Sequence, residues 1–185
     1  MSSTLPVSER AAQLRRDFDR AFAEPPARRP EAPVDLLAIR LGTQPYALRL
    51  AEVAGLFVDK KLTRLPNSRP EFLGLAGFRG SVVPVYDLRL LLGHAGAAAP
   101  RWLVTAAAGV VALAFDGFDG HLRLPQEAIA QPQRSAAVRR HVRGLVQAGA
   151  ERSPAAAGLL RPIVDLASVL EAIGQGAAAP PPPPE

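Results

Sequence analysis

The stretch FLGLAGFRGSVVPVYDLR, residues 72–89, decides the fold of this 185-residue chain. Its run at 82–86 is apolar and rich in β-branched residues, which is typical of a buried β-strand. A Gly-Ser pair precedes this run, and Asp87 follows it where the N-cap of a short helix is expected. The stretch therefore predicts a turn, a strand and a short helix in direct succession.

Much of this stretch recurs later in the chain, since PVYDL at 84–88 matches PIVDL at 162–166. The other matched blocks, in chain order, are YALRLAEVAG at 46–55 with VALAFDGFDG at 111–120, RLP at 64–66 with RLP at 123–125, and the apolar pairs 91–92 and 169–170. Four blocks in the same order predict two related β units, at about 34–95 and 101–173. Each unit is too small to bury much surface alone, so we expect them to share a core.

The remaining predicted strands are short and are separated by Gly and Pro. They lie at 35–41 and 46–50 around a hairpin turn at 42–45, at 102–106 and 110–115 around a turn at 108–109, and at 163–164. Short strands of this kind favour a mainly β fold of small barrels or a sandwich. The second unit has an additional segment at 131–154, which we interpret as a mobile surface loop.

The two ends of the chain differ from this centre. Residues 1–24 predict an amphipathic helix whose apolar stripe is Leu14, Phe18 and Phe22. That stripe either docks on its own domain or binds a partner. Around the predicted β domain at 34–175, a Pro-rich linker is expected at 25–33 and a disordered Ala/Pro tail at 176–185.

Composition narrows the chemistry and the location of the protein. The chain has no cysteine, which excludes disulfides and thiolate metal sites. No apolar run approaches the roughly 20 residues that span a bilayer, and the start lacks the apolar stretch of a signal peptide. We therefore expect a cytoplasmic protein without direct membrane insertion.

Motifs for catalysis or cofactor binding are missing from the sequence. The histidines His94, His121 and His141 lie far apart, and none has a partner at metal-ligand spacing. The three glycines at 74–80 lack the Lys-Ser/Thr pair of a phosphate-binding loop, and no nucleophile elbow is present. We expect no enzyme, no catalytic residue, no cofactor and no metal.

The formal net charge of +5 raises a second hypothesis. Arg134, Arg139, Arg140 and Arg143 lie in a segment, 128–150, without a single acidic residue. A basic small barrel is one architecture that binds nucleic acid. This segment has no aromatic residue on which bases could stack, so nucleic-acid binding is the alternative and no nucleic-acid partner is expected.

The stretch at 72–89 resembles the signature of CheW-like domains, in which a segment of the form G-x-x-N-L-R-G precedes V-x-P-V-x-D-L. The resemblance extends over about residues 34–173. It implies a fold of two intertwined, five-stranded, SH3-like β barrels around a shared hydrophobic core, with short helices at the ends of the subdomains.

The resemblance also implies a function. CheW-like proteins are non-catalytic adaptors that couple chemoreceptors to a CheA-type histidine kinase in chemotaxis-like two-component signal transduction. The partners implied are the regulatory domain of that kinase and the cytoplasmic tip of a methyl-accepting chemoreceptor. Such a protein is cytoplasmic and is recruited to membrane-associated receptor arrays.

The resemblance also points to residues that bind these partners. By position, Val53, Gly74 and Arg79 match family positions tied to partner surfaces. Their neighbours Leu56 and Phe78 complete the predicted partner-binding set. Arg79 is the clearest candidate, because a guanidinium on a Gly-flanked turn presents several donors outward.

This chain departs from the family pattern at two places near the arginine. Residues 77–78 are Gly-Phe where the family has Asn-Leu, and Gly55 stands where many members have an acidic residue that pairs with the arginine. Arg79 is then expected to pair with Glu52 or Asp59, or to contact a partner directly.

Overall fold

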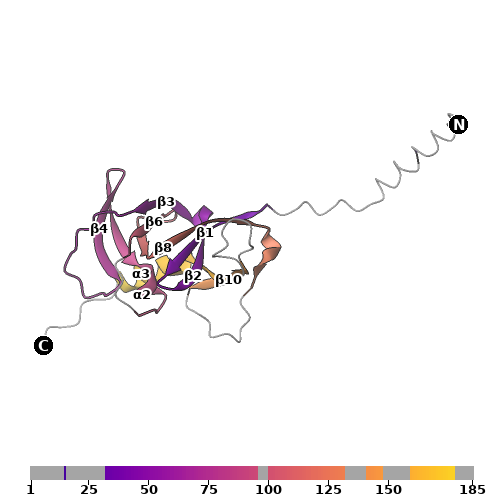
Figure 1. Cartoon of the computed structure of the whole chain (residues 1–185). Helices are drawn as coiled ribbons and strands as arrows, with labels where there is room; N and C mark the ends of the chain where they lie inside the picture. The colour runs from indigo at the N-terminus through magenta and orange to yellow at the C-terminus, as the bar shows by residue number, and fades with distance from the viewer. Residues whose placement is uncertain (1–14, 16–31, 96–99, 132–140, 148–158, 178–185) are drawn as a thin grey trace, which may run out of the picture. The chain divides into compact units, whose positions relative to one another are not determined.

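The computed structural model describes residues 15, 32–95, 100–131, 141–147 and 159–177 (Figure 1). Apart from residue 15, the predicted N-terminal helix lies outside these described residues, as do most of the linker and the tail from residue 178 onward. The strands and helices, in chain order, are β1 (Val34–Leu41), β2 (Gln44–Arg49), η1 (Leu50–Glu52), β3 (Val53–Val58), β4 (Phe72–Phe78), β5 (Ser81–Asp87), α2 (Leu88–Leu91), β6 (Trp102–Ala106), β7 (Ala112–Phe115), β8 (Gly117–Leu124), η2 (Gln126–Ala128), β9 (Ile129–Ala130), β10 (Val142–Gln147), β11 (Leu160–Val164) and α3 (Leu166–Ala177).

The strands form two sheets, and each sheet takes strands from both halves of the chain (Figure 1). The six-stranded sheet has the order β8-β1-β2-β11-β10-β9, and the five-stranded sheet has the order β3-β6-β7-β5-β4. Neighbouring strands are antiparallel except for β2 with β11 and β5 with β7. The mainly β fold is as predicted.

The number of strands in one sheet differs from the prediction. One sheet has six strands instead of five, because β9 adds to the edge of β10. Within the described residues, the two edge strands of either sheet form no ladder with each other, so closure of the sheets into barrels is not shown. The five-stranded sheet has only a single bridge, between Thr63 and Leu75, at the position where β9 lies in the other sheet.

The sequence repeat reappears in the register of the parallel pairs. Val85 of β5 lies opposite Ala112 of β7, and Ile163 of β11 lies opposite Ala47 of β2. Val85 matches Ile163 in the repeat, and Ala112 matches Ala47. Each sheet therefore pairs the second strand of one unit with the last strand of the other, and the two units are intertwined.

The predicted interpretation of 131–154 as a surface loop is wrong for 142–147, which forms β10. This strand is the counterpart of β4 in the second repeat. Gly144 of β10 lies opposite Ile163, as Gly74 of β4 lies opposite Val85, and both glycines follow a break in register. Gly74 has a φ of +131°, a conformation that favours glycine, whereas at Gly144 a Cβ would lie 3.0 Å from the Ile129 side chain.

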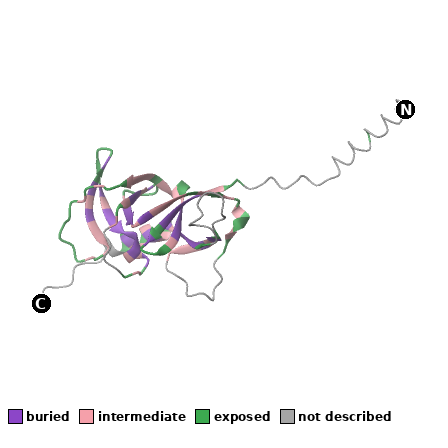
Figure 2. Cartoon of the chain, in the orientation of Figure 1, coloured by how far each residue is buried: buried purple, intermediate pink, exposed green. Residues whose placement is uncertain are grey.

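The largest hydrophobic core lies between the two sheets, and Figure 2 shows buried residues on the strands of both. Tyr46 and Leu48 enter it from the six-stranded sheet, and Leu113 and Phe115 enter it from the five-stranded sheet. Two smaller clusters fill the other face of each sheet. Burying such a side chain contributes about 1.5–3 kcal/mol, so the shared core binds the two sheets together.

The two short helices begin at matched aspartates, as predicted. The Asp87 carboxylate accepts hydrogen bonds from the backbone N–H groups of Arg89 and Leu90, at 2.9 and 3.4 Å. The Asp165 carboxylate accepts one from the N–H of Ser168 at 3.3 Å. These carboxylates satisfy helix N–H groups that have no partner within the helix. No helix among the described residues is long and apolar enough to cross a membrane.

Candidate partner-binding site

Arg79 lies at the tip of the hairpin that joins β4 to β5. The two-residue turn Arg79-Gly80 has positive φ angles of 47° and 85°, a combination that a type I′ turn requires. Gly80 adopts this conformation freely, but a side chain in the left-handed region costs about 1–2 kcal/mol. The turn presents Arg79 to solvent at a position where asparagine or glycine would fit the backbone better.

The structure excludes both intramolecular pairs that the sequence suggested for Arg79. Glu52 pairs with Arg143. Asp59 pairs with Arg101, with two N···O distances of 2.7 and 2.9 Å. In the part of the chain that the structure describes, Arg79 forms no hydrogen bond or ion pair.

A side chain at Gly55 would require the Phe57 ring to move. A Cβ at Gly55 would lie 2.8 Å from the Phe57 ring and 3.3 Å from the Thr105 hydroxyl. Phe57 therefore occupies the space into which a carboxylate at this position would extend. The guanidinium of Arg79 is left available for a group other than the described residues.

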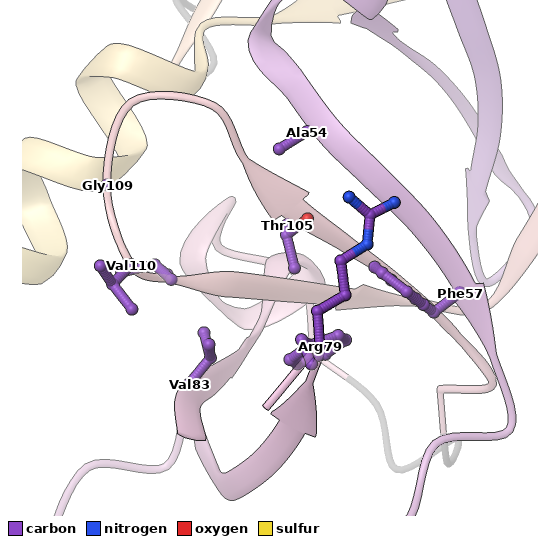
Figure 3. Close-up of a pocket in the computed structure, with 9 residues that line it drawn as sticks. Ala54, Phe57, Arg79, Val83, Thr105, Gly109 and Val110 are labelled. Atoms are coloured by element: carbon purple, nitrogen blue, oxygen red, sulfur yellow. The ribbon is translucent and has the colours of Figure 1, made fainter. Parts of the chain in front are cut away.

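The Arg79 side chain extends over an apolar groove of about 210 Å³ (Figure 3). Figure 3 shows Arg79 reaching toward Ala54, with Phe57 on one side and Val83 and Val110 on the other. The residues that line the groove are Ala54, Phe57, Phe78, Arg79, Val83, Thr105, Gly109, Val110 and Val111. Val110 at its edge is 68% exposed and so adds apolar surface to the rim of the groove.

Two aromatic rings in edge-to-face contact form one wall of the groove. Phe57 and Phe78 meet edge to face with their ring centroids 4.8 Å apart. The Lys60 ammonium lies 5.3 and 5.5 Å from these two centroids and donates a hydrogen bond to the Gly77 carbonyl at 3.3 Å. Edge-to-face rings and an ammonium over their faces both stabilise this arrangement. The wall is thus aromatic and carries the positive charge of Lys60.

The five predicted partner-binding residues do not form one surface. Arg79 and Phe78 line the groove, although Phe78 is only 5% exposed. Val53 and Leu56 on β3 are half-buried and pack against the shared core. Gly74 is buried at φ +131°, and a Cβ there would lie 2.3 Å from the Thr63 carbonyl oxygen.

The sequence did not reveal most of the groove. Ala54 and Phe57 come from β3, and Val83 comes from β5, two strands at different places in the sheet. Val110 and Val111 belong to the turn before β7, in the second half of the chain. No local pattern links these residues, because only the interchange of strands between the repeats brings them together.

Ion pairs and burial shift the pKa values of several charged residues. The hydrogen bond from Arg101 lowers the pKa of Asp59, and the same bond raises the pKa of Arg101. Burial lowers the pKa of Arg143, which contacts Glu52 and lies 3.9 Å from Asp165. Arg143 of the basic segment thus engages the chain's own acids, while Arg134, Arg139 and Arg140 lie outside the described residues.

The three histidines make separate structural contacts. His94 is hydrogen-bonded to the Tyr46 hydroxyl at 2.6 Å, His121 to Asp35 at 2.8 Å, and His141 to the Ser168 hydroxyl at 2.7 Å. Within the described ranges, no group of three His, Asp or Glu side chains is arranged to hold a metal ion.

Comparison with known proteins decides the family. The family model of the CheW-like domain matches residues 35–174, most of the chain. This chain belongs to the CheW-like domain family. As a CheW-like protein it is a non-catalytic scaffold that couples receptors to a kinase in chemotaxis.

A solved structure supports the fold of this CheW-like protein. The crystal structure of the scaffolding protein TtCheW from Thermoanaerobacter tengcongensis is similar to it with a TM-score of 0.61. The sequence identity is 17%, and the similarity covers 71% of this chain and 88% of that one. No curated protein is similar enough in sequence to count as a match.

Proposed function

We propose that this CheW-like protein binds the regulatory domain of a CheA-type histidine kinase through the hairpin tip and the groove around Arg79. The observation that carries this proposal is that Arg79 lies above an apolar groove and forms no hydrogen bond or ion pair with any described residue. Exposed apolar hollows that are rimmed by polar groups mark interaction sites in soluble proteins. A family of scaffolds acts through such surfaces, because it has no chemistry of its own.

We propose different tasks for the five predicted residues. Arg79 contacts the partner directly, and Phe78 forms the floor on which the contact rests. Gly74 allows the close approach of β4 to Thr63 and so sets the position of the hairpin. Val53 and Leu56 connect β3 to the shared core, so a partner that presses on the groove also acts on the packing between the sheets.

The second proposed partner is the cytoplasmic tip of a methyl-accepting chemoreceptor. That tip is a helical hairpin, so its apolar face would be recognised by the helix-in-groove mode. The protein would then act in the cytoplasm, at membrane-associated receptor arrays. A scaffold needs separate surfaces for its two partners, because both must be held at once.

Calorimetry with the regulatory domain of the CheA-type kinase from the same organism tests the proposal. The full-length chain is expected to bind with a measurable dissociation constant in the micromolar range or below, about −8 kcal/mol. A fragment of the receptor's cytoplasmic tip is expected to bind the same chain without displacing the kinase domain. No binding of the kinase domain at high micromolar concentration would refute the proposed function.

A further inference from the structure

The groove around Arg79 has a counterpart in the six-stranded sheet, because the two sheets are built from repeated strands. The repeat that matches Val85 with Ile163 also matches Val83 of β5 with Arg161 of β11. In the same way, Ala54 of β3 corresponds to Asp119 of β8. Both Ala54 and Asp119 lie at a break in register beside the neighbouring strand.

In the six-stranded sheet this place is filled by the chain's own side chains. Arg161 is 1% exposed, donates to the Asp119 carboxylate at 2.9 Å and donates to the Ile39 carbonyl at 3.2 Å. Asp119 also accepts a hydrogen bond from Arg40 at 2.7 Å. A buried arginine needs such partners, because an unpaired buried charge is strongly destabilising. We call this pair of Arg161 and Asp119 the internal plug.

The five-stranded sheet lacks the internal plug. Its two corresponding residues, Ala54 and Val83, are short and apolar, and both line the open groove. The strand order and the register breaks are equivalent in the two sheets, so the fold itself does not require the hollow. Of the two equivalent positions, the one in the six-stranded sheet is filled by the internal plug, and the one in the five-stranded sheet is an open groove.

The groove around Arg79 has an apolar floor, and its rim carries positive charge. Its volume of about 210 Å³ exceeds the roughly 150 Å³ apolar cavity that holds a benzene ring. Lys60 lies over the two aromatic rings of its wall, and Asp59 near the rim is neutralised by Arg101. Arg79 supplies a further charge that no described residue balances.

We infer that the partner inserts its own plug: one large apolar side chain enters the groove, and a carboxylate next to it on the partner pairs with Arg79. This inference rests on the proposed function, since the partner is the kinase regulatory domain. It adds the chemistry that this domain must carry, namely an apolar residue beside an acidic one. Arg79 is then a specificity-determining residue, because a partner without the acid leaves the guanidinium unpaired.

Transplanting the internal plug tests the apolar half of the inference. The double variant A54D/V83R places at the groove the two residues that fill the equivalent site. We expect the arginine to occupy the groove and to weaken binding of the kinase regulatory domain by about tenfold or more. Urea unfolding of the variant checks that the fold is kept. Unchanged affinity of a folded variant would overturn the inference.

Charge reversal at Arg79 tests whether the partner carries the inferred carboxylate. It also tests the inference if the double variant A54D/V83R does not fold. Arg79→Glu is expected to weaken binding by about tenfold or more, and the wild-type affinity is expected to fall as salt is raised. Reversal of one partner carboxylate to arginine should restore binding to Arg79→Glu. Lys61→Glu is the matched control, since Lys61 is exposed on the adjacent loop and does not line the groove.

The outcomes separate this inference from the proposed function. If the wild-type chain fails to bind the kinase domain, the proposed function fails. If the wild-type chain binds and the two variants Arg79→Glu and Lys61→Glu bind with equal affinity, the proposed function stands. The inferred carboxylate is then refuted.

Discussion

Asp87 and Asp165 occupy matched positions of the two repeats and begin matched helices, yet their surroundings differ. Asp87 is 4% exposed and also pairs with the buried guanidinium of Arg89 at 3.5 Å. Asp165 is partly exposed and lies 3.9 Å from Arg143. A comparison of Asp87 with Asp165 therefore separates the contribution of a helix cap to stability from that of a buried charge.

Asp87→Ala is expected to lower the free energy of unfolding by about 2–4 kcal/mol, because the cap is lost and Arg89 loses a buried carboxylate. Asp165→Ala, the matched control, should cost only about 1 kcal/mol, the usual contribution of a cap. Urea denaturation followed by circular dichroism measures both losses. Equal losses for the two variants would contradict the distinction.

Two glycines of β4 give an equally direct comparison. Gly74→Ala forces a Cβ to within 2.3 Å of a backbone oxygen at φ +131°, so we expect a loss of about 2 kcal/mol or more. A Cβ at Gly77 meets nothing within 4 Å, and Gly77→Ala should be neutral or stabilising by up to about 1 kcal/mol. Unfolding midpoints measure the difference, and equal midpoints would show that Gly74 is not conformationally required.

Single residues also show how far the sequence could predict the site. The exposure of Arg79 was predictable, because a Gly-flanked turn after a strand presents its side chain outward. Its lack of a partner among the described residues was not predictable, because Asp59 is held by an arginine 42 positions away in the chain. The burial of Gly74 likewise depends on Thr63, in a loop without a regular pattern.

At the scale of elements, the hairpin of β4 and β5 has a strained turn at Arg79, the same residue that we propose to contact the kinase regulatory domain. Arg79→Asn would fit the left-handed position better, and asparagine before glycine is favoured in type I′ turns. We expect this variant to raise the free energy of unfolding by about 0.5–1 kcal/mol and to weaken kinase binding. Thermal unfolding and calorimetry measure the two effects. If Arg79→Asn is more stable and binds the kinase domain with the affinity of the wild type, the arginine is not kept for binding.

The strand β10 shows what the sequence repeat could not reveal. Its match to β4 is limited to a Gly-Leu pair, at 144–145 and 74–75, within otherwise different residues. Arginines surround β10 in the sequence, so its composition favoured a surface loop. Its place is fixed by backbone hydrogen bonds to β11, which no composition argument can supply.

At the scale of the whole molecule, the interchange of strands makes the two sheets depend on each other. The repeat predicted two units around a common core, but a repeat does not show which strand pairs with which. The parallel pairs β2 with β11 and β5 with β7 join distant parts of the chain. Neither sheet can form from one half of the sequence alone.

We therefore expect a single cooperative unfolding transition for the full chain. Trp102, the sole tryptophan, lies in the five-stranded sheet with its ring 5.3 Å from Phe118 of the six-stranded sheet. Its fluorescence should change together with circular dichroism during urea denaturation. Phe115→Ala in the shared core should shift both transitions equally, by about 3–5 kcal/mol. Two separated transitions would show that the sheets unfold independently.

The most direct test of the scaffold account is calorimetric titration of the kinase regulatory domain into three forms of the full chain. These are the wild type, Arg79→Glu and the control Lys61→Glu. The account predicts that the wild type and the control bind with similar affinity and that Arg79→Glu binds about tenfold more weakly or worse. Equal binding by all three forms, or no binding by the wild type, would contradict a scaffold that docks through the Arg79 groove.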